Sequence, residues 1–189
     1  MTNAELAGVI AFLRAAEQLK NTTRTSWTST GQQETVAAHT WRLCLMSLLF
    51  ARHFADVDVA KLLKICIIHD LGEAVSGDVS AVLQQGRPPK AEQERADLLQ
   101  LLTPLPEPLR AEIVGLWDEY EAATSQEARL AKAFDKLETI MQHNQGRNPP
   151  DFDYRFNLDY GRQYTAGDPL IEAVRELLDR ETEARAQGR

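Results

Sequence analysis

Four residues of this chain have the chemistry needed to hold one divalent metal ion: His39, the adjacent pair His69 and Asp70, and Asp135. Imidazole nitrogens and carboxylate oxygens suit Co, Mn, Fe and Zn and, less well, Mg. The chain has only four His, so two of them in this set is a selective use of the residue. An ion bound by four protein groups, with positions left open, is typical of a hydrolytic site.

Each of these residues could also have an ordinary structural role. His39 alone fits a hydrogen-bonded, partly buried His, and Asp135 alone fits a solvated carboxylate on a helix. The pair His69-Asp70 is harder to assign to structure alone, because it follows the apolar run at residues 65–68. A carboxylate buried there costs several kcal/mol unless a metal or a strong partner compensates it. The sequence therefore favours a metal.

Helices must position these residues, since apolar side chains recur at helical spacing through almost the whole chain. Residues 21–33, rich in Thr and Ser, are expected to form a loop. The segment 59–74 is apolar nearly all round, which predicts the central, most buried helix. The other expected helices are one through Leu6 and Leu13, one over 34–54, one over 89–102, one holding Trp117 and Tyr120, one with Leu130 and Leu137 on its stripe, and one capped by Asp168-Pro169 and ending near Glu183.

The predicted fold is therefore all-α: a single helical bundle domain over residues 1–189, with a core of about 4–183 and a frayed tail. Adjacent residues on a helix point about 100° apart. His69 and Asp70 can then share an ion only at the edge between them, to which two other helices must bring His39 and Asp135.

The bulk composition excludes several classes of partner. A net charge of −7 argues against a groove for DNA or RNA polymers. The first residues lack the basic segment of a signal peptide, and no run approaches the ~20 apolar residues that span a bilayer. We therefore expect a cytoplasmic protein with no membrane partner. Cys44 and Cys66 lie in apolar runs and are expected to be buried hydrophobic residues.

Six short stretches together resemble the 5'-deoxynucleotidase branch of the HD-domain metal-dependent phosphohydrolases. They occur in order over about residues 10–180. One departure is Ala38, where these proteins usually carry Glu or Asp; it puts in doubt a hydrogen bond near the first ligand, not the ligand itself. The stretches are Arg24-Thr-Ser-Trp27, Glu34-Thr-Val-Ala-Ala-His39, His69-Asp70-Leu-Gly-Glu73, Gly77-Asp78, Leu116-Trp-Asp-Glu-Tyr120 and Asp135-Lys136.

This resemblance implies a role for each of four further residues. Glu73 would be a general acid/base or water-orienting group, and Asp78 a second catalytic or substrate-orienting carboxylate. Arg24 and Trp27 would recognise the substrate, Arg through its bidentate contact with phosphate and the indole against a sugar or base. The family also implies a homodimer. From the residues alone, Glu73 reads equally well as a solvated carboxylate at a helix end, and Asp78 as an N-cap.

Other polar and aromatic residues receive structural roles. Trp41, Trp117 and Tyr120 are assigned to packing, and Lys136 to a solvated face, although it could reach a phosphate. Glu34 is expected to cap or orient the second helix, or to lie just behind the ligands.

The expected activity is that of a metal-dependent phosphomonoesterase releasing phosphate from nucleoside 5'-monophosphates, with a deoxyribose preference that rests on the resemblance alone. A phosphodiesterase or a nucleoside triphosphate hydrolase of the same type is one alternative. A metal-stabilised helical interaction module without turnover is another. Glu73 and Asp78 argue against the module, because a purely structural ion gains nothing from two further carboxylates nearby.

Overall fold

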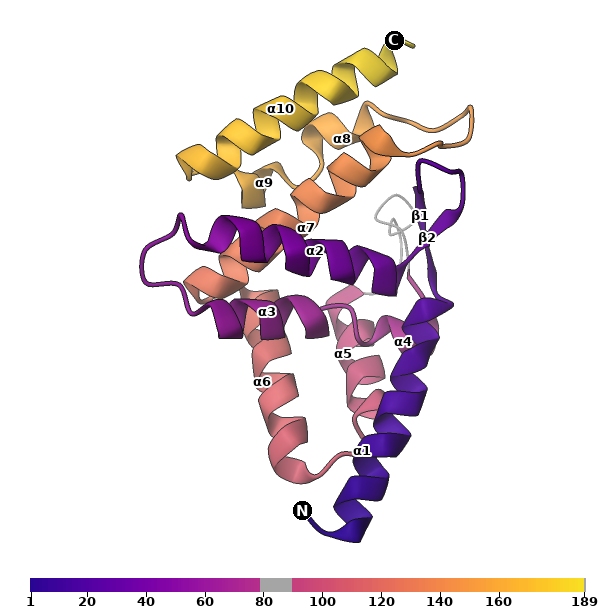
Figure 1. The fold of residues 1–189 in the computed structure, drawn as a ribbon, viewed down its shortest axis with the longest axis vertical. Helices are drawn as coiled ribbons and strands as arrows, with labels where there is room; N and C mark the ends of the chain where they lie inside the picture. Colours follow the sequence, from indigo (N-terminus) through magenta and orange to yellow (C-terminus); the bar gives the residue numbers. More distant parts are fainter. Residues whose placement is uncertain (79–89, 189) are drawn as a thin grey trace.

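The computed structural model describes residues 1–78 and 90–188 and is helical apart from one short hairpin, which confirms the all-α prediction (Figure 1). No helix of these two segments combines the length and apolar composition needed to cross a membrane. The elements are α1 (Asn3–Ala16), η1 (Glu17–Lys20), β1 (Thr23–Trp27), β2 (Gln33–Thr35), α2 (Val36–Ala51), α3 (Val59–Ile68), α4 (Glu73–Ser76), α5 (Lys90–Leu101), α6 (Glu107–Ala122), α7 (Gln126–Gln145), α8 (Phe156–Asp159), α9 (Arg162–Thr165) and α10 (Pro169–Ala186).

The central helix is α7, so the prediction that the segment 59–74 would be most buried is wrong. Fifteen of the 20 residues of α7 are buried, and α2, α3, α6 and α10 all pack against it. In α3 only four of ten residues are buried, and Ile67 is 54% exposed. The sequence misleads here because eight of the buried residues of α7 are polar or charged, so its burial is not visible as hydrophobicity.

The segment 59–74 also does not form one helix. The α3 helix ends at Ile68, a turn spans residues 69–72, and α4 begins at Glu73. Gly72 lies in this turn, and a Cβ built on it would meet the backbone oxygen of Glu94 in α5 at 2.6 Å. Any larger residue at this position would collide with α5. Glycine therefore allows the backbone of the turn to lie close to α5.

The polar segment 21–33, expected to be a loop, forms most of a hairpin instead. Strands β1 and β2 pair antiparallel, with Thr23 opposite Thr35 and Trp27 opposite Gln33. Thr residues favour a pleated, half-buried surface, which the loop prediction undervalued. The hairpin runs directly into α2, whose N-cap is Thr35: its hydroxyl accepts the amide N–H of Ala38. Glu34 therefore does not cap this helix.

Two apolar clusters fill the interior, and the pair His69-Asp70 lies where the chain passes between them. Ile65 and Cys66 belong to a cluster built mainly by α2, α3 and α7. Ile68 and Leu71 belong to a second cluster, with residues from α5 and α6. Well-packed apolar residues on both sides therefore fix the backbone that carries these two polar side chains.

The C-terminal part of α7 is joined to α8 by a buried polar contact. The Nδ1 atom of His143 lies 2.8 Å from Oδ1 of Asn157, and both residues are buried. Burial disfavours the charged imidazole and lowers the pKa of His143 to about 4. His143 is therefore neutral in the folded protein at pH 7.

This pKa predicts a pH dependence of folding stability. Below pH 6.5 the unfolded chain takes up a proton on His143 that the folded protein binds only near pH 4. Stability should therefore fall between pH 6.5 and 4, by up to about 3 kcal/mol from this residue. Urea unfolding across that range should show a smaller decline for His143→Gln than for the unmodified protein. Equal declines in both would contradict the assignment.

Candidate metal centre

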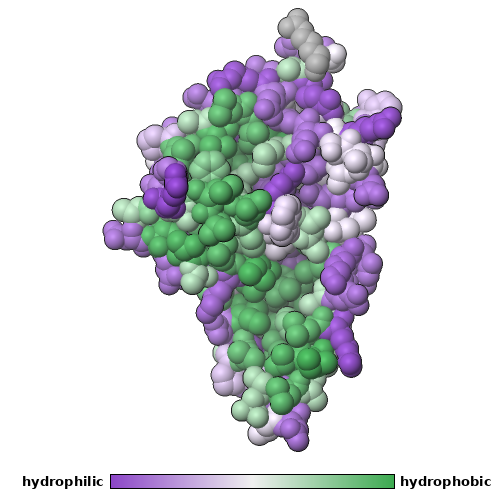
Figure 2. All heavy atoms as spheres, in the orientation of Figure 1, coloured by the Kyte–Doolittle hydropathy of each residue, from purple (hydrophilic) through white to green (hydrophobic). Residues whose placement is uncertain are grey.

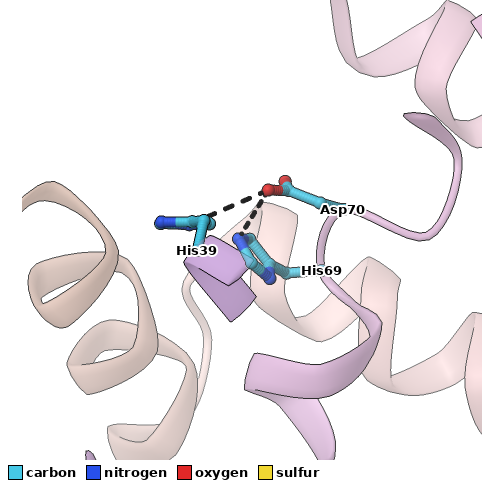
Figure 3. A group of neighbouring side chains, drawn as sticks. All are labelled: His39, His69 and Asp70. Atoms are coloured by element: carbon cyan, nitrogen blue, oxygen red, sulfur yellow. Dashed lines mark ion pairs between the residues drawn. The ribbon is translucent and has the colours of Figure 1, made fainter. Parts of the chain in front are cut away.

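Three helices bring the four predicted ligands together at one point. His39 comes from α2, His69 and Asp70 from the turn after α3, and Asp135 from α7. Oδ2 of Asp70 lies 3.0 Å from Nε2 of His69 and 3.9 Å from Nε2 of His39 (Figure 3). Oδ1 of Asp135 lies 3.2 Å and 4.0 Å from Nε2 of His39 and His69, respectively. The two carboxylates therefore face the same pair of nitrogens.

Both imidazoles are held by Nδ1, which leaves Nε2 directed at the centre of the group. Nδ1 of His69 lies 2.8 Å from the carbonyl oxygen of Cys66, and Nδ1 of His39 bonds a carboxylate oxygen of Glu138. Both acceptors require the hydrogen on Nδ1. Both Nε2 atoms are buried, face the carboxylates of Asp70 and Asp135, and have no hydrogen bond of good geometry. Buried nitrogens of this kind are costly unless a ligand uses their lone pairs.

Asp135 is oriented in the same manner. Its Oδ2 accepts a hydrogen bond from the Tyr120 hydroxyl at 3.2 Å and one from Nζ of Lys136 at 2.7 Å, so Oδ1 is left for the centre. Burial alone would raise the pKa of Asp135, but Lys136 and the two imidazoles hold it well below its usual range. The carboxylate is therefore ionised, as a metal ligand must be.

The four side chains fit a divalent ion. Metal–ligand distances of about 2.0–2.2 Å place neighbouring ligand atoms roughly 3 to 4 Å apart. The ligand atoms of His39, His69 and Asp70 all lie within 4.8 Å of one another, and Oδ1 of Asp135 lies 3.2 Å and 4.0 Å from the two imidazole nitrogens. The charges around His39 also favour a cation at this centre. Burial and the nearby Arg24 lower the pKa of His39, but Glu138 and Asp135 outweigh them and raise it to about 9. The surroundings of His39 thus favour a positive charge at this point.

A second buried polar group lies behind His39, and sequence reasoning did not identify its central residue, Glu138. The ligand atoms of Glu34, His39 and Glu138 lie within 4.8 Å of one another. Arg42 Nε donates to Glu138 Oε1 at 2.7 Å, and Arg24 Nη1 lies 3.6 Å from Glu34 and 3.7 Å from Glu138. Two guanidinium groups therefore balance these two carboxylates.

The remaining predicted site residues come from α4, from the position after Gly77 and from β1, and their roles stay predictions. Glu73 is 4% exposed at the start of α4, and Asp78 is half-buried after Gly77, whose φ of 83° favours glycine. The N-cap prediction for Asp78 concerns residues 79–89, which lie outside the described segments. Trp27 is half-buried, with its ring edge against Phe152 at a centroid distance of 6.4 Å.

Two of the structural assignments, those of Trp41 and Lys136, are wrong, and two others are confirmed with an added role. Trp41, expected to pack, is 67% exposed on α2, because it lies on the face of that helix turned away from the core. Lys136, expected to be solvated, is bound to Asp135. Trp117 and Tyr120 are buried as expected, but they also orient ligands: the Trp117 indole N–H donates to the backbone oxygen of His69 at 3.0 Å.

Comparison with known proteins agrees with this geometry. A model of the HD domain matches residues 16–175. The chain is 32% identical to mouse 5'-deoxynucleotidase HDDC2 over 138 residues, covering 72% of this chain and 68% of the mouse protein. It is 29% identical to the Dictyostelium discoideum protein of the same name over 186 residues, 92% of this chain and 98% of that one.

The fold is likewise similar to a solved structure. The crystal structure of a predicted metal-dependent phosphohydrolase from Magnetospirillum magnetotacticum superposes with a TM-score of 0.83 at 27% identity, covering 96% of this chain and 94% of that one. The quartet of ligands, the helical fold and these matches lead to one conclusion: this chain belongs to the HD-domain family.

Proposed function

We propose that this protein is a metal-dependent 5'-nucleotidase that hydrolyses nucleoside 5'-monophosphates, with a preference for 2'-deoxynucleotides, to nucleoside and phosphate. The observation that carries the proposal is the convergence of the buried Nε2 atoms of His39 and His69 on the carboxylates of Asp70 and Asp135. The substrate class follows from the relatives, which are named 5'-deoxynucleotidases. The expected single domain over residues 1–189 is part of this proposal.

His39, His69, Asp70 and Asp135 would hold the ion. When bound there, a divalent ion supplies Lewis acidity, which polarises a phosphoryl oxygen and lowers the pKa of water. The native metal is left open among Co, Mn, Fe, Zn and Mg, all of which accept nitrogen and carboxylate ligands.

Each of the side chains around the ion would have its own role in the reaction. Glu73 would orient the attacking water or pass a proton to the leaving 5'-oxygen, and Asp78 would hold the phosphate-side network. Arg24 suits the phosphoryl group, because Thr139 fixes its Nη2 at 3.0 Å and its guanidinium is cationic beside the centre, where it also pairs with Glu34 and Glu138. Its positive charge would stabilise charge developing on the phosphoryl oxygens. Trp27 would form a wall of the sugar pocket.

Ion binding by Asp135 is tested by thermal unfolding with and without added Mn²⁺ or Co²⁺ after chelation. At an ion concentration 100 times the dissociation constant, the melting temperature of the unmodified protein should rise by roughly 5–10 °C. Asp135→Asn should lose most of this rise. Asp118→Asn, which breaks a surface ion pair with Arg95, is the control and should keep it. An equal rise in Asp135→Asn would contradict its role as a ligand.

The activity is tested by phosphate release from ribo- and deoxynucleoside 5'-monophosphates with each added ion. We expect metal-dependent release, faster with deoxynucleotides. Glu73→Gln should lower the rate by about 10²- to 10⁴-fold while retaining the ion-induced rise in melting temperature. If no ion supports release although ions bind, the monophosphatase proposal fails, and diester and triphosphate substrates become the next to assay.

A homodimer is also part of the proposal, and an exposed apolar face of α2 supports it. Trp41, Leu45, Leu48 and Leu49 follow helical spacing and are 40–67% exposed. Hydrophobic residues gather over the middle of the molecular face on which α2 and α3 lie (Figure 2).

Light scattering after size-exclusion chromatography tests the dimer. Leu49→Glu should shift the protein to monomers, because it places a charge in the interface of each copy. Leu13→Glu is the matched control: Leu13 is 56% exposed on α1, against 61% for Leu49, and its substitution should leave the dimer intact. A monomeric unmodified protein, or dissociation by Leu13→Glu alone, would rule out the α2 interface.

A further inference from the structure

We propose that Glu138 is a positioning residue for His39: its carboxylate holds the imidazole in the tautomer and ring orientation that direct Nε2 at the metal. The inference rests on the metal centre of the proposed function. Glu138 lies three residues after Asp135, on the same side of α7. One helix thus carries both a ligand and the group that orients a second ligand from α2.

The contact between the two side chains is direct and fully buried. Oε2 of Glu138 bonds Nδ1 of His39, and both residues are 0% exposed. Because an ionised carboxylate only accepts hydrogen bonds, it holds a hydrogen on Nδ1, and Nε2 is the nitrogen left for the ion. A carboxylate behind a metal-bound His also raises the basicity of the ligand nitrogen.

Two arginines keep this carboxylate charged and immobile. Nε of Arg42 lies 2.7 Å and Nη2 2.6 Å from Oε1 of Glu138, so that oxygen is held while the other faces His39. Nη1 of Arg24 lies 3.7 Å from Oε2. A buried carboxylate without such partners would cost several kcal/mol. The position of Glu138 is therefore fixed from two sides, as a group that orients another must be.

The same atoms do not form a second metal site, although Glu34, His39 and Glu138 lie close enough together to suggest one. Nη2 of Arg42 lies 3.9 Å from Glu34, and Nη1 of Arg24 lies 3.6 Å from it. A cation among these carboxylates would meet two guanidinium groups within a few ångströms, and the repulsion would exceed the gain. Glu34 and the arginines therefore form the support of Glu138.

His69 provides an internal comparison. Its Nδ1 is held by the backbone oxygen of Cys66, a contact made by its own helix end, which no side-chain substitution can remove. Only His39 depends on a side chain from another helix. Ala38, which lacks the acidic group usual before the first His, is exposed and could not replace Glu138 in this role. Loss of Glu138 should thus affect one of the two imidazole ligands selectively.

The test is Co²⁺ titration of Glu138→Gln without substrate, followed by visible absorption. Gln keeps the volume but removes the charge, so the dissociation constant should rise about 10- to 100-fold. The absorption bands at saturation should also shift, because the coordination of Co²⁺ through His39 changes. Glu127→Gln is the matched control. Glu127 lies on the same helix, is 7% exposed and pairs with Lys61, and its loss should change stability but neither the dissociation constant nor the bands.

Glu138→Asp covers the case in which the Gln variant does not fold. Asp keeps the charge beside the arginines but is one methylene too short to reach Nδ1, so an intermediate loss of Co²⁺ affinity with shifted bands is expected. Wild-type affinity and bands in the soluble Glu138 variants would overturn the inference. If the unmodified protein binds no Co²⁺, both the metal centre and this inference fail. If it binds Co²⁺ but cleaves no nucleotide, only the substrate assignment fails.

Discussion

Asp135 and Glu138 bring two carboxylates, one helical turn apart, into the most buried helix of this protein. Each is 5% exposed or less. Charges buried this deeply require partners of opposite sign or strong hydrogen bonds. Asp135 meets Lys136 and Tyr120, and Glu138 meets Arg42 and His39. By packing against α7, the helices α2 and α6 therefore supply partners for these two buried charges as well as burying apolar surface.

Buried polar side chains near the C-terminal end of α7 likewise need hydrogen-bond partners. Gln142 donates to the backbone oxygen of Trp27 in β1, which fixes the hairpin that carries Arg24. Asn144 donates to the backbone oxygen of Leu178 and accepts from Thr182, which holds α10. Each buried polar side chain thus anchors a different element, and Arg42 links Gln142 to Glu138 behind the candidate metal centre.

The sequence predicted the parts of the site that depend on residue type and order. A carboxylate directly after an apolar run needs a compensating cation, which singled out the pair His69-Asp70. His39 and Asp135 joined the set through their ligand chemistry and the resemblance to the HD-domain family, and the structure brings these four together. Glu138 was missed because its local pattern is that of a solvated helix carboxylate. Its partner Arg42 is 96 residues away along the chain. Contacts of that separation leave no local signal.

The incorrect predictions about the fold arose for the same reason: local sequence does not show contacts between distant residues. The centrality of α7 was missed because hydrophobicity is a poor measure of burial when polar groups are paired. The hairpin was missed because Thr-rich segments suit loops and edge strands alike, and only the pairing of β1 with β2 decides between them. Trp41 was assigned to packing by its size, but it lies on the outward face of α2. In each case tertiary contacts decided what local composition left open.

The balance of charge around the centre explains how an acidic protein can accept a phosphate. Distances of 4.0 Å or less connect four carboxylates and three cationic side chains, those of Glu34, Asp70, Asp135, Glu138, Arg24, Arg42 and Lys136. One negative charge is left over, and the raised pKa of His39, about 9, lets a proton supply the missing positive charge. A divalent ion that displaces this proton makes the group more positive by one charge. The loaded centre would therefore attract an anionic substrate more strongly than the empty one, despite a net charge of −7 for the whole chain.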